Sequence, residues 1–211
     1  MYSRKITLIG VCVLVGLLAL SCTPKGKPRV LVPPEFDLGR YKTVTVADFQ
    51  GQIDEWGKKI ASYLEEDLTK AKVEGDPYFK VVPRSQLYEV LEDYNLQTGD
   101  LADPEVALKV GRLLGVDAIF TGTVLEAHTD QWIYQYWRLG VILTARVKFN
   151  VQVNSTETGS VVIDQTVSQM RRKDVVGGAE LAAKESNDQP LTSCAREAVE
   201  KFIRMIVPHY G

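Results

Sequence analysis

The second half of the chain alternates between apolar and polar residues with a period of two. The odd positions from Trp137 to Val153 are apolar throughout, whereas the even positions include Arg138, Thr144, Arg146, Lys148, Asn150 and Gln152. Strict alternation of this kind predicts a long antiparallel strand with one buried face. Glu157, Thr158 and Gly159 form a turn signal, so residues 160–170 are predicted to return as the second strand of a hairpin.

Other segments repeat apolar residues at helical spacing instead. Amphipathic helices are predicted over residues 53–68, 87–94 and 191–206. A further helix is predicted to begin at Asp103 and Pro104, because an Asp side chain caps free N–H groups and Pro suits the first helical position. Gly115 fits the left-handed residue that ends this helix.

Short runs of β-branched and aromatic residues predict strands over residues 43–49, 79–82 and 116–125. The resulting order is strand, helix, strand, helix, helix, strand, hairpin, helix. We therefore expect an α/β protein, built as a three-layer or two-layer sandwich with a mixed sheet flanked by helices.

The amino terminus has the pattern of an export signal. Arg4 and Lys5 precede an uncharged apolar run, residues 6–20, which is long enough for a signal peptide and short for a membrane-spanning helix. The run ends at Ser21 and Cys22, a small residue directly before a cysteine, which resembles the lipobox of bacterial lipoproteins. We expect residues 1–21 to be a cleaved signal and Cys22 to carry the lipid. The alternative is ordinary secretory cleavage after residues 19–21, which would release an unanchored protein.

Residues 22–42 are rich in Lys, Pro and Gly and predict a lipidated tether, followed by one domain over residues 43–211. The whole chain has a formal net charge of −2, which gives no support for nucleic-acid binding. Lipidation of Cys22 would leave Cys194 without a disulfide partner. Because Cys194 lies on the apolar stripe of the last helix, we expect a buried, inert thiol.

The sequence carries no recognisable catalytic or cofactor-binding constellation. His128 and His209 are the two histidines, neither stands in a catalytic pattern, and no phosphate-binding loop or Cys/His zinc spacing is present. Gly177 and Gly178 follow a run of cations, which suggests either an anion site or, as we expect, a flexible turn. We predict a protein that is not an enzyme and binds no metal or cofactor.

An ordered set of segments resembles the curli-assembly outer-membrane lipoprotein family, the CsgG-like proteins. These segments are Val44–Phe49, Phe79–Leu87, Leu101–Pro104, Leu113–Gly122, Asn154–Gly159 and Ser186–Leu191 with the following helix. The resemblance implies a lipid-anchored outer-membrane protein whose domain faces the periplasm, with envelope proteins or copies of itself as partners. It also leaves the role open, because this broad superfamily includes curli-type secretion channels and lipoproteins that form no pore, such as activators of peptidoglycan synthases.

By the same resemblance, a channel would place membrane hairpins at residues 128–144 and 171–187. Four aromatic residues in the first window suit an interfacial girdle: Trp132, Tyr134, Tyr136 and Trp137. Packing within the protein or a surface for a partner protein is the rival interpretation of the same residues. The second window is dense in charge, and residues 179–184 look helical. We therefore favour a non-enzymatic assembly, secretion or accessory module of the envelope and keep the secretion channel as the alternative.

Overall fold

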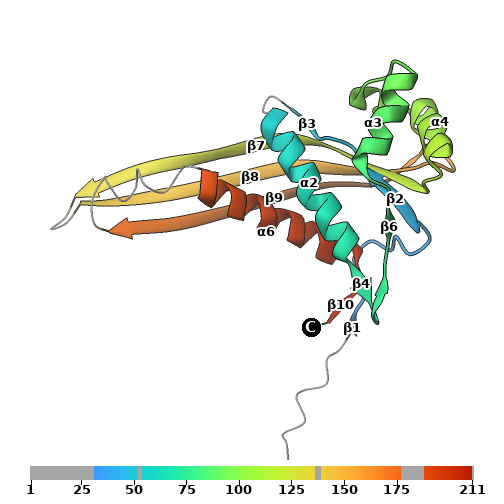
Figure 1. The fold of residues 1–211 in the computed structure, drawn as a ribbon. Coiled ribbons are helices and arrows are strands. Elements are labelled where there is room, and N and C mark those ends of the chain that lie inside the picture. The colour runs from blue at the N-terminus through green and yellow to red at the C-terminus, as the bar shows by residue number, and fades with distance from the viewer. Residues whose placement is uncertain (1–30, 52–53, 136–138, 177–187, 211) are drawn as a thin grey trace, which may run out of the picture. The chain divides into compact units, whose positions relative to one another are not determined.

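The computed structural model describes residues 31–51, 54–135, 139–176 and 188–210. Residues 32–209 form one compact unit. Its main sheet has the strand order β6-β2-β7-β8-β9, and β3 also pairs with β7 (Figure 1). The strands are β2 (Thr43–Val46), β3 (Gln50–Gly51), β6 (Lys80–Val81), β7 (Ala118–Gln135), β8 (Leu139–Ser155) and β9 (Val161–Val176).

The sheet is mixed, as the sequence predicts. β2 pairs in parallel with β6 and β7, whereas β8 pairs antiparallel with β7 and with β9. Two minor sheets of two strands accompany it, one of β4 (Lys72–Val73) with β5 (Asp76–Pro77) and one of β1 (Leu31–Val32) with β10 (His209–Tyr210).

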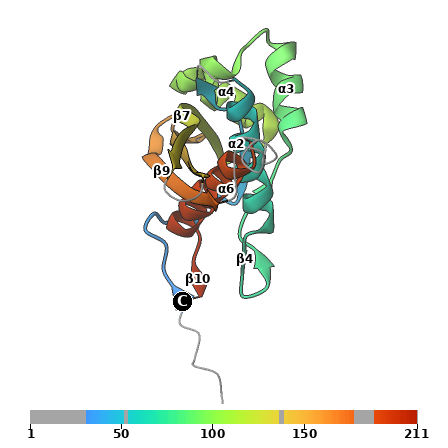
Figure 2. The same ribbon diagram turned by 90° about the vertical axis from the view of Figure 1, so that its left-hand side faces the viewer.

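Helices cover both faces of the sheet, which makes three layers. On one face, α2 (Asp54–Lys70) and α6 (Asp188–Ile206) bury their apolar stripes in the larger core, which includes Phe120 and Phe202. On the other face lie α3 (Arg84–Asp93), the 3-10 helix η2 (Thr98–Ala102) and α4 (Pro104–Leu114), and Figure 2 labels α3 and α4. These elements enclose a smaller core that includes Ile119. The alternation of Ile119 and Phe120 along β7 assigns one residue to each core.

The predicted caps of α4 are confirmed in detail. The Asp103 side chain accepts a hydrogen bond from the backbone N–H of Glu105 at 2.8 Å, and Pro104 is the first helical residue. Gly115 ends the helix with a φ of 65°, a left-handed conformation that glycine adopts at low cost.

Two residues of the segment after α4 have structural roles that its sequence alone does not reveal. The Asp117 carboxylate accepts hydrogen bonds from the backbone N–H groups of Lys42 and Thr43, both at 2.8 Å, and so ties the start of β7 to β2. At Gly122, a Cβ atom would lie 2.5 Å from the Asn150 carbonyl oxygen and 2.5 Å from the Phe49 ring. Only glycine fits this approach without a shift of the backbone or the ring.

β7 and β9 extend further than the sequence predicts. β7 ends at Gln135 rather than at Leu125, and β9 ends at Val176 rather than at residue 170. The β7 pattern was hidden because the register shifts between Val124 and Glu126, so the buried positions change from even to odd numbers. Pairing with the long β8 therefore carries both strands through sequence that lacks apolar alternation.

The amino-terminal end of the described chain also packs more closely than expected. Leu38 and Tyr41, which lie within the segment predicted to be a tether, are buried in the larger core. The predicted inert thiol is confirmed as a buried group: Cys194 lies in α6, and its Sγ is 3.2 Å from the carbonyl oxygen of Gln169. Within the described ranges, no helix is long and apolar enough to cross a membrane.

Candidate functional site

The three strands β7, β8 and β9 present one face away from α6, which we call the open face. Directly paired residues share a face of a sheet, so the register defines its rows. The rows run from Thr121–Gln152–Asp164 at the helical end to Trp132–Ile142–Asp174 and then Tyr134–Gly140 at the far end. α6 contacts the opposite face, where the Cys194 thiol approaches the backbone of β8 and β9.

Aromatic side chains occupy the far end of the open face. Trp132 is 70% exposed, and Tyr134 follows it on the same face of β7. Tyr134 is paired with Gly140, and a Cβ atom at position 140 would lie 2.3 Å from the Tyr134 ring, so the glycine lets that ring lie against β8. Two of the four predicted contact aromatics therefore share a surface, whereas Tyr136 and Trp137 lie outside the described residues.

Charged side chains separate the aromatic end from the helical end. Asp130 Oδ2 lies 3.5 Å from Arg146 Nη1 and 3.5 Å from His128 Nε2. Glu126 Oε1 lies 3.6 Å from the same His128 nitrogen. All of these side chains are about one third exposed or more, so such pairs add little to the free energy of unfolding. They make the middle of the open face mixed in charge and hydrophilic.

The end of β9 is charged on both of its faces. The register places Arg172 and Asp174 on the open face, in the rows of Thr144 and Ile142. Arg171 and Lys173 face the other side, where Arg171 forms an ion pair with Glu197 of α6. The first predicted hairpin window, residues 128–144, is a β-hairpin in the structure, since β7 and β8 pair as far as Gln135 and Leu139. Of the second window, only residues 171–176 are described, and they are the end of β9.

The remaining predicted groups gather into no reactive site. His128 lies in β7 and His209 in β10, and Cys22 lies outside the described residues. In the part of the chain that the structure describes, no group of three or more His, Cys, Asp or Glu side chains is placed to hold a metal ion.

Sequence reasoning missed a polar hub around Arg84 at the start of α3. The Arg84 guanidinium donates to Asp48 at 2.5 Å, to Glu65 at 2.8 Å and to Ser62 at 2.6 Å. The hub thus links the segment after β2 with α2 and α3. Burial, followed by the nearby Asp48 carboxylate, raises the pKa of the adjacent Tyr88 hydroxyl. The sequence shows only that Asp48 follows a strand closely and that Arg84 begins a helix. Their ion pair becomes apparent only when the fold brings the two side chains together.

Together, these features define a three-layer α/β protein in which the far part of the open face, around Trp132, extends beyond the described helices. The family model for the curli production assembly/transport component CsgG matches residues 17–131, more than half of the chain. The protein belongs to this family. The match ends within β7, so the segments that carry β8, β9 and α6 lie beyond it. A search of curated proteins finds no match.

Solved structures are similar to this chain at low sequence identity. The PelC dodecamer from Paraburkholderia phytofirmans has a TM-score of 0.50 and 13% identity, covering 86% of this chain and 99% of that one. Lipoprotein GNA1162 from Neisseria meningitidis has a TM-score of 0.47 and 17% identity, covering 77% and 97%. The LpoB C-terminal domain from Salmonella enterica has a TM-score of 0.37 and 12% identity, covering 60% and 81%. The similarity to PelC shows a shared fold and does not by itself show a shared function.

Proposed function

We propose that this protein is an outer-membrane lipoprotein whose folded domain faces the periplasm. Residues 1–21 serve as the signal, Cys22 carries diacylglycerol and an N-linked acyl chain such as palmitate, and the residues up to the packed Leu38 connect the lipid to the domain. Membership of the CsgG family supports this assignment. More than one acyl chain is needed for stable anchoring, because a single chain binds a membrane only marginally.

Mass spectrometry of the mature amino terminus tests the anchor. We expect a chain that begins at Cys22 and carries the mass of three acyl groups, recovered with outer-membrane vesicles after cell fractionation. Cys22→Ser blocks lipidation and is expected to move the protein away from the membrane fraction. An unmodified Cys22 in the soluble periplasmic fraction would contradict the proposal.

Within the envelope, the protein acts as a non-enzymatic accessory or assembly module. The observation that carries this role is the aromatic end of the open face, where Trp132 is 70% exposed. Exposed aromatic side chains supply much of the energy of protein interfaces. We propose that Trp132 and Tyr134 contact an envelope protein, with Tyr136 and Trp137 as further members of the same surface.

The charges of β9 oppose insertion of these strands into lipid. A lipid-facing strand needs an apolar side, yet each face of residues 171–174 carries charge. An Arg or Lys at the bilayer midplane costs about 2–4 kcal/mol on the lipid face. Insertion would place at least one cation of β9 toward lipid, whichever face turned outward.

A secretion channel is the second candidate, and one observation favours it. The β7–β8 hairpin is 18 and 17 residues long on its two sides, and in Figure 1 its far end extends beyond α6. PelC, which shares the fold, forms a dodecamer. Under the channel hypothesis, we expect this chain to associate with copies of itself. Electron microscopy of the detergent-extracted protein tests this, because a channel requires closed rings.

Single-channel recording in planar bilayers separates the two roles. The full lipoprotein is compared with a Cys22→Ala variant that lacks residues 1–21. We expect no conductance from either. Reproducible stepwise conductance that disappears on deletion of residues 132–140 would contradict the accessory role and support a channel.

Site-specific photo-crosslinking in cells tests the contact surface. A crosslinker at position 132 is expected to capture one envelope protein, whereas a crosslinker at position 170 is the control. Met170 is also exposed, at 61%, and lies on the same open face away from the aromatic end. Equal capture at both positions would argue against a defined surface at Trp132.

A further inference from the structure

The helical end of the open face has a different chemistry from the aromatic end. Two adjacent rows there hold only hydroxyl, amide and carboxylate side chains, and we call them the polar rows: Thr121, Gln152 and Asp164, then Thr123, Asn150 and Thr166. β3 widens the second row, because Gln50 is the parallel partner of Thr123. The polar rows thus span four strands, or roughly 14 Å at the usual strand spacing.

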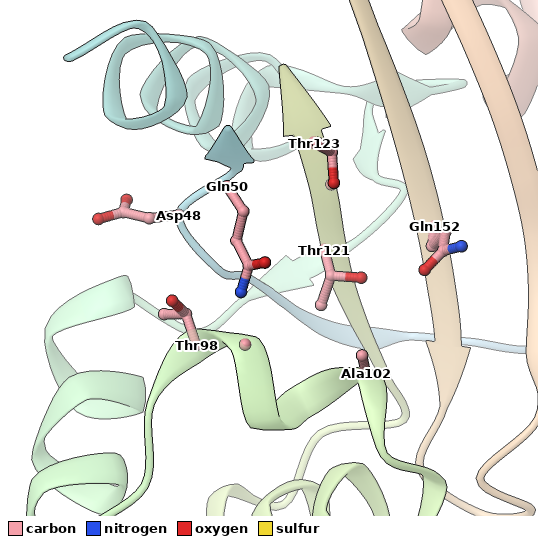
Figure 3. A pocket seen from close by; sticks show the side chains of 9 residues that line it. Asp48, Gln50, Thr98, Ala102, Thr121, Thr123 and Gln152 are labelled. Carbon is pink, nitrogen blue, oxygen red and sulfur yellow. The ribbon is translucent and has the colours of Figure 1, made fainter. Parts of the chain in front are cut away.

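A small cleft lies where the polar rows meet η2. Its volume is about 50 Å³, and its lining includes Gln50, Thr98, Gly99, Thr121 and Gln152. In Figure 3 the Gln50 side chain extends into the space between η2 and β7, while Asp48 points away from it. Thr121, Thr123 and Gln152 of the polar rows therefore form one side of this cleft, and η2 forms the other.

Hydrogen bonds orient the amide groups of the polar rows. Asp164 accepts from Asn150 Nδ2 at 2.6 Å and from Gln152 Nε2 at 3.1 Å. These two bonds lower the pKa of Asp164, so its carboxylate stays ionised. Asn150 Nδ2 also lies 3.5 Å from Thr166 Oγ1, so the amide nitrogens point along the rows toward β9. The Asn150 and Gln152 carbonyl oxygens are the acceptors that these two side chains can offer to a ligand.

The threonines supply the matching donors. Thr121 lines the cleft, and its Oγ1 accepts a hydrogen bond from Asn154 Nδ2 at 3.2 Å, so its own O–H is a donor that it can offer to a ligand. Thr123 and Thr166 are exposed and have rotatable hydroxyls. The polar rows therefore offer interleaved donors and acceptors beside the cleft, with one carboxylate held by two amide hydrogen bonds.

This chemistry selects among ligand classes. The polar rows contain no Lys or Arg, which phosphate-bearing ligands and anionic membranes require for strong attraction. They contain no aromatic or aliphatic side chain, whereas protein interfaces need a desolvated apolar centre. A sugar hydroxyl is both donor and acceptor, and neighbouring hydroxyls of a glycan suit interleaved partners. We propose that the polar rows and the cleft beside η2 bind a hydroxyl-rich glycan chain.

Glycan binding at the polar rows is independent of the proposed accessory role. The aromatic end is separated from the polar rows by the charged rows of Glu126, His128 and Asp130. Loss of one activity therefore leaves the other measurable, and the two proposals fail separately.

Nuclear magnetic resonance titration of the full chain in detergent micelles, with an N-acetylglucosamine tetramer as probe, tests the inference. We expect saturable shifts of the side-chain amide signals of Gln50, Asn150 and Gln152. Asp164→Asn removes the charged acceptor and frees the two amides from their present orientation, so the affinity is expected to fall at least about tenfold.

Asp130→Asn is the matched control, because it makes the same chemical change on the same open face outside the polar rows. It is expected to leave the affinity unchanged, and circular dichroism checks that both variants remain folded. Three results would overturn the inference: no glycan-dependent shift, which would make the cleft a hydration site only; equal weakening by both variants; or shifts that depend on protein concentration without glycan, which would assign the surface to a second copy of the chain.

Discussion

Removal of the Arg84 side chain is expected to destabilise the protein more than removal of any exposed arginine. Arg84→Ala deletes the guanidinium that donates to Asp48, Glu65 and Ser62. It leaves two carboxylates close together at the junction of β2, α2 and α3. The helix itself is little affected, because Ala and Arg have similar helix propensities.

The size of this destabilisation depends on how much of the Arg84 cluster is buried. The Arg84 and Asp48 side chains are each 19% exposed, and Glu65 is 24% exposed. Breaking a fully buried ion pair from one side costs about 3–5 kcal/mol, whereas an exposed pair contributes about 0–1 kcal/mol. With about a fifth of each side chain exposed, we expect a loss of about 2–4 kcal/mol in the free energy of unfolding.

Urea unfolding followed by circular dichroism measures this loss, using the Cys22→Ala variant without residues 1–21 as the background. Arg204→Ala is the control, because Arg204 pairs with Glu200 on α6 with the two side chains 61% and 57% exposed. The control is expected to change the unfolding free energy by less than about 1 kcal/mol. The loss of unfolding free energy in Arg84→Lys should lie between these two values, since a lysine keeps the positive charge but lacks the planar guanidinium with its several N–H donors. Equal effects of Arg84→Ala and Arg204→Ala would refute the reasoning.

Three further predictions follow from individual contacts. Burial raises the pKa of the Cys194 thiol, so a maleimide is expected to label it only after unfolding; rapid labelling of the native protein would contradict its packing against β8 and β9. Gly122→Ala is expected to cost about 1–3 kcal/mol in urea unfolding, because the added methyl group overlaps the Asn150 carbonyl and the Phe49 ring. Asn150→Ala is expected to raise the pKa of Asp164 in a carboxyl NMR titration. The pKa of Asp164 is lowered in the native protein, so its contribution to stability is present above the usual Asp pKa. This contribution is lost as the pH falls through the pKa of Asp164 in the folded protein. An unchanged titration of Asp164 in Asn150→Ala would exclude the hydrogen bond from Asn150 as the cause.

Local sequence patterns were sufficient for most secondary structure and for the family. The α4 caps at Asp103 and Gly115 depend on residues within one or two turns, and the alternation from position 139 onward reports directly on a half-buried strand. The same local reading placed Cys194 on a buried stripe, which the structure confirms. Such features are readable because the interacting groups are close in sequence or repeat with the period of one element.

The tertiary structure decided what depends on contacts between distant segments. The choice of three layers over two required the positions of α3 and α4 relative to α2 and α6. The length of β7 required its register with β8, because the shift at Val124 erases the period-two signal. The Arg84 hub joins residues up to 36 positions apart. Individually these side chains resemble ordinary surface polar groups, and their roles arise from pairing that no local pattern encodes.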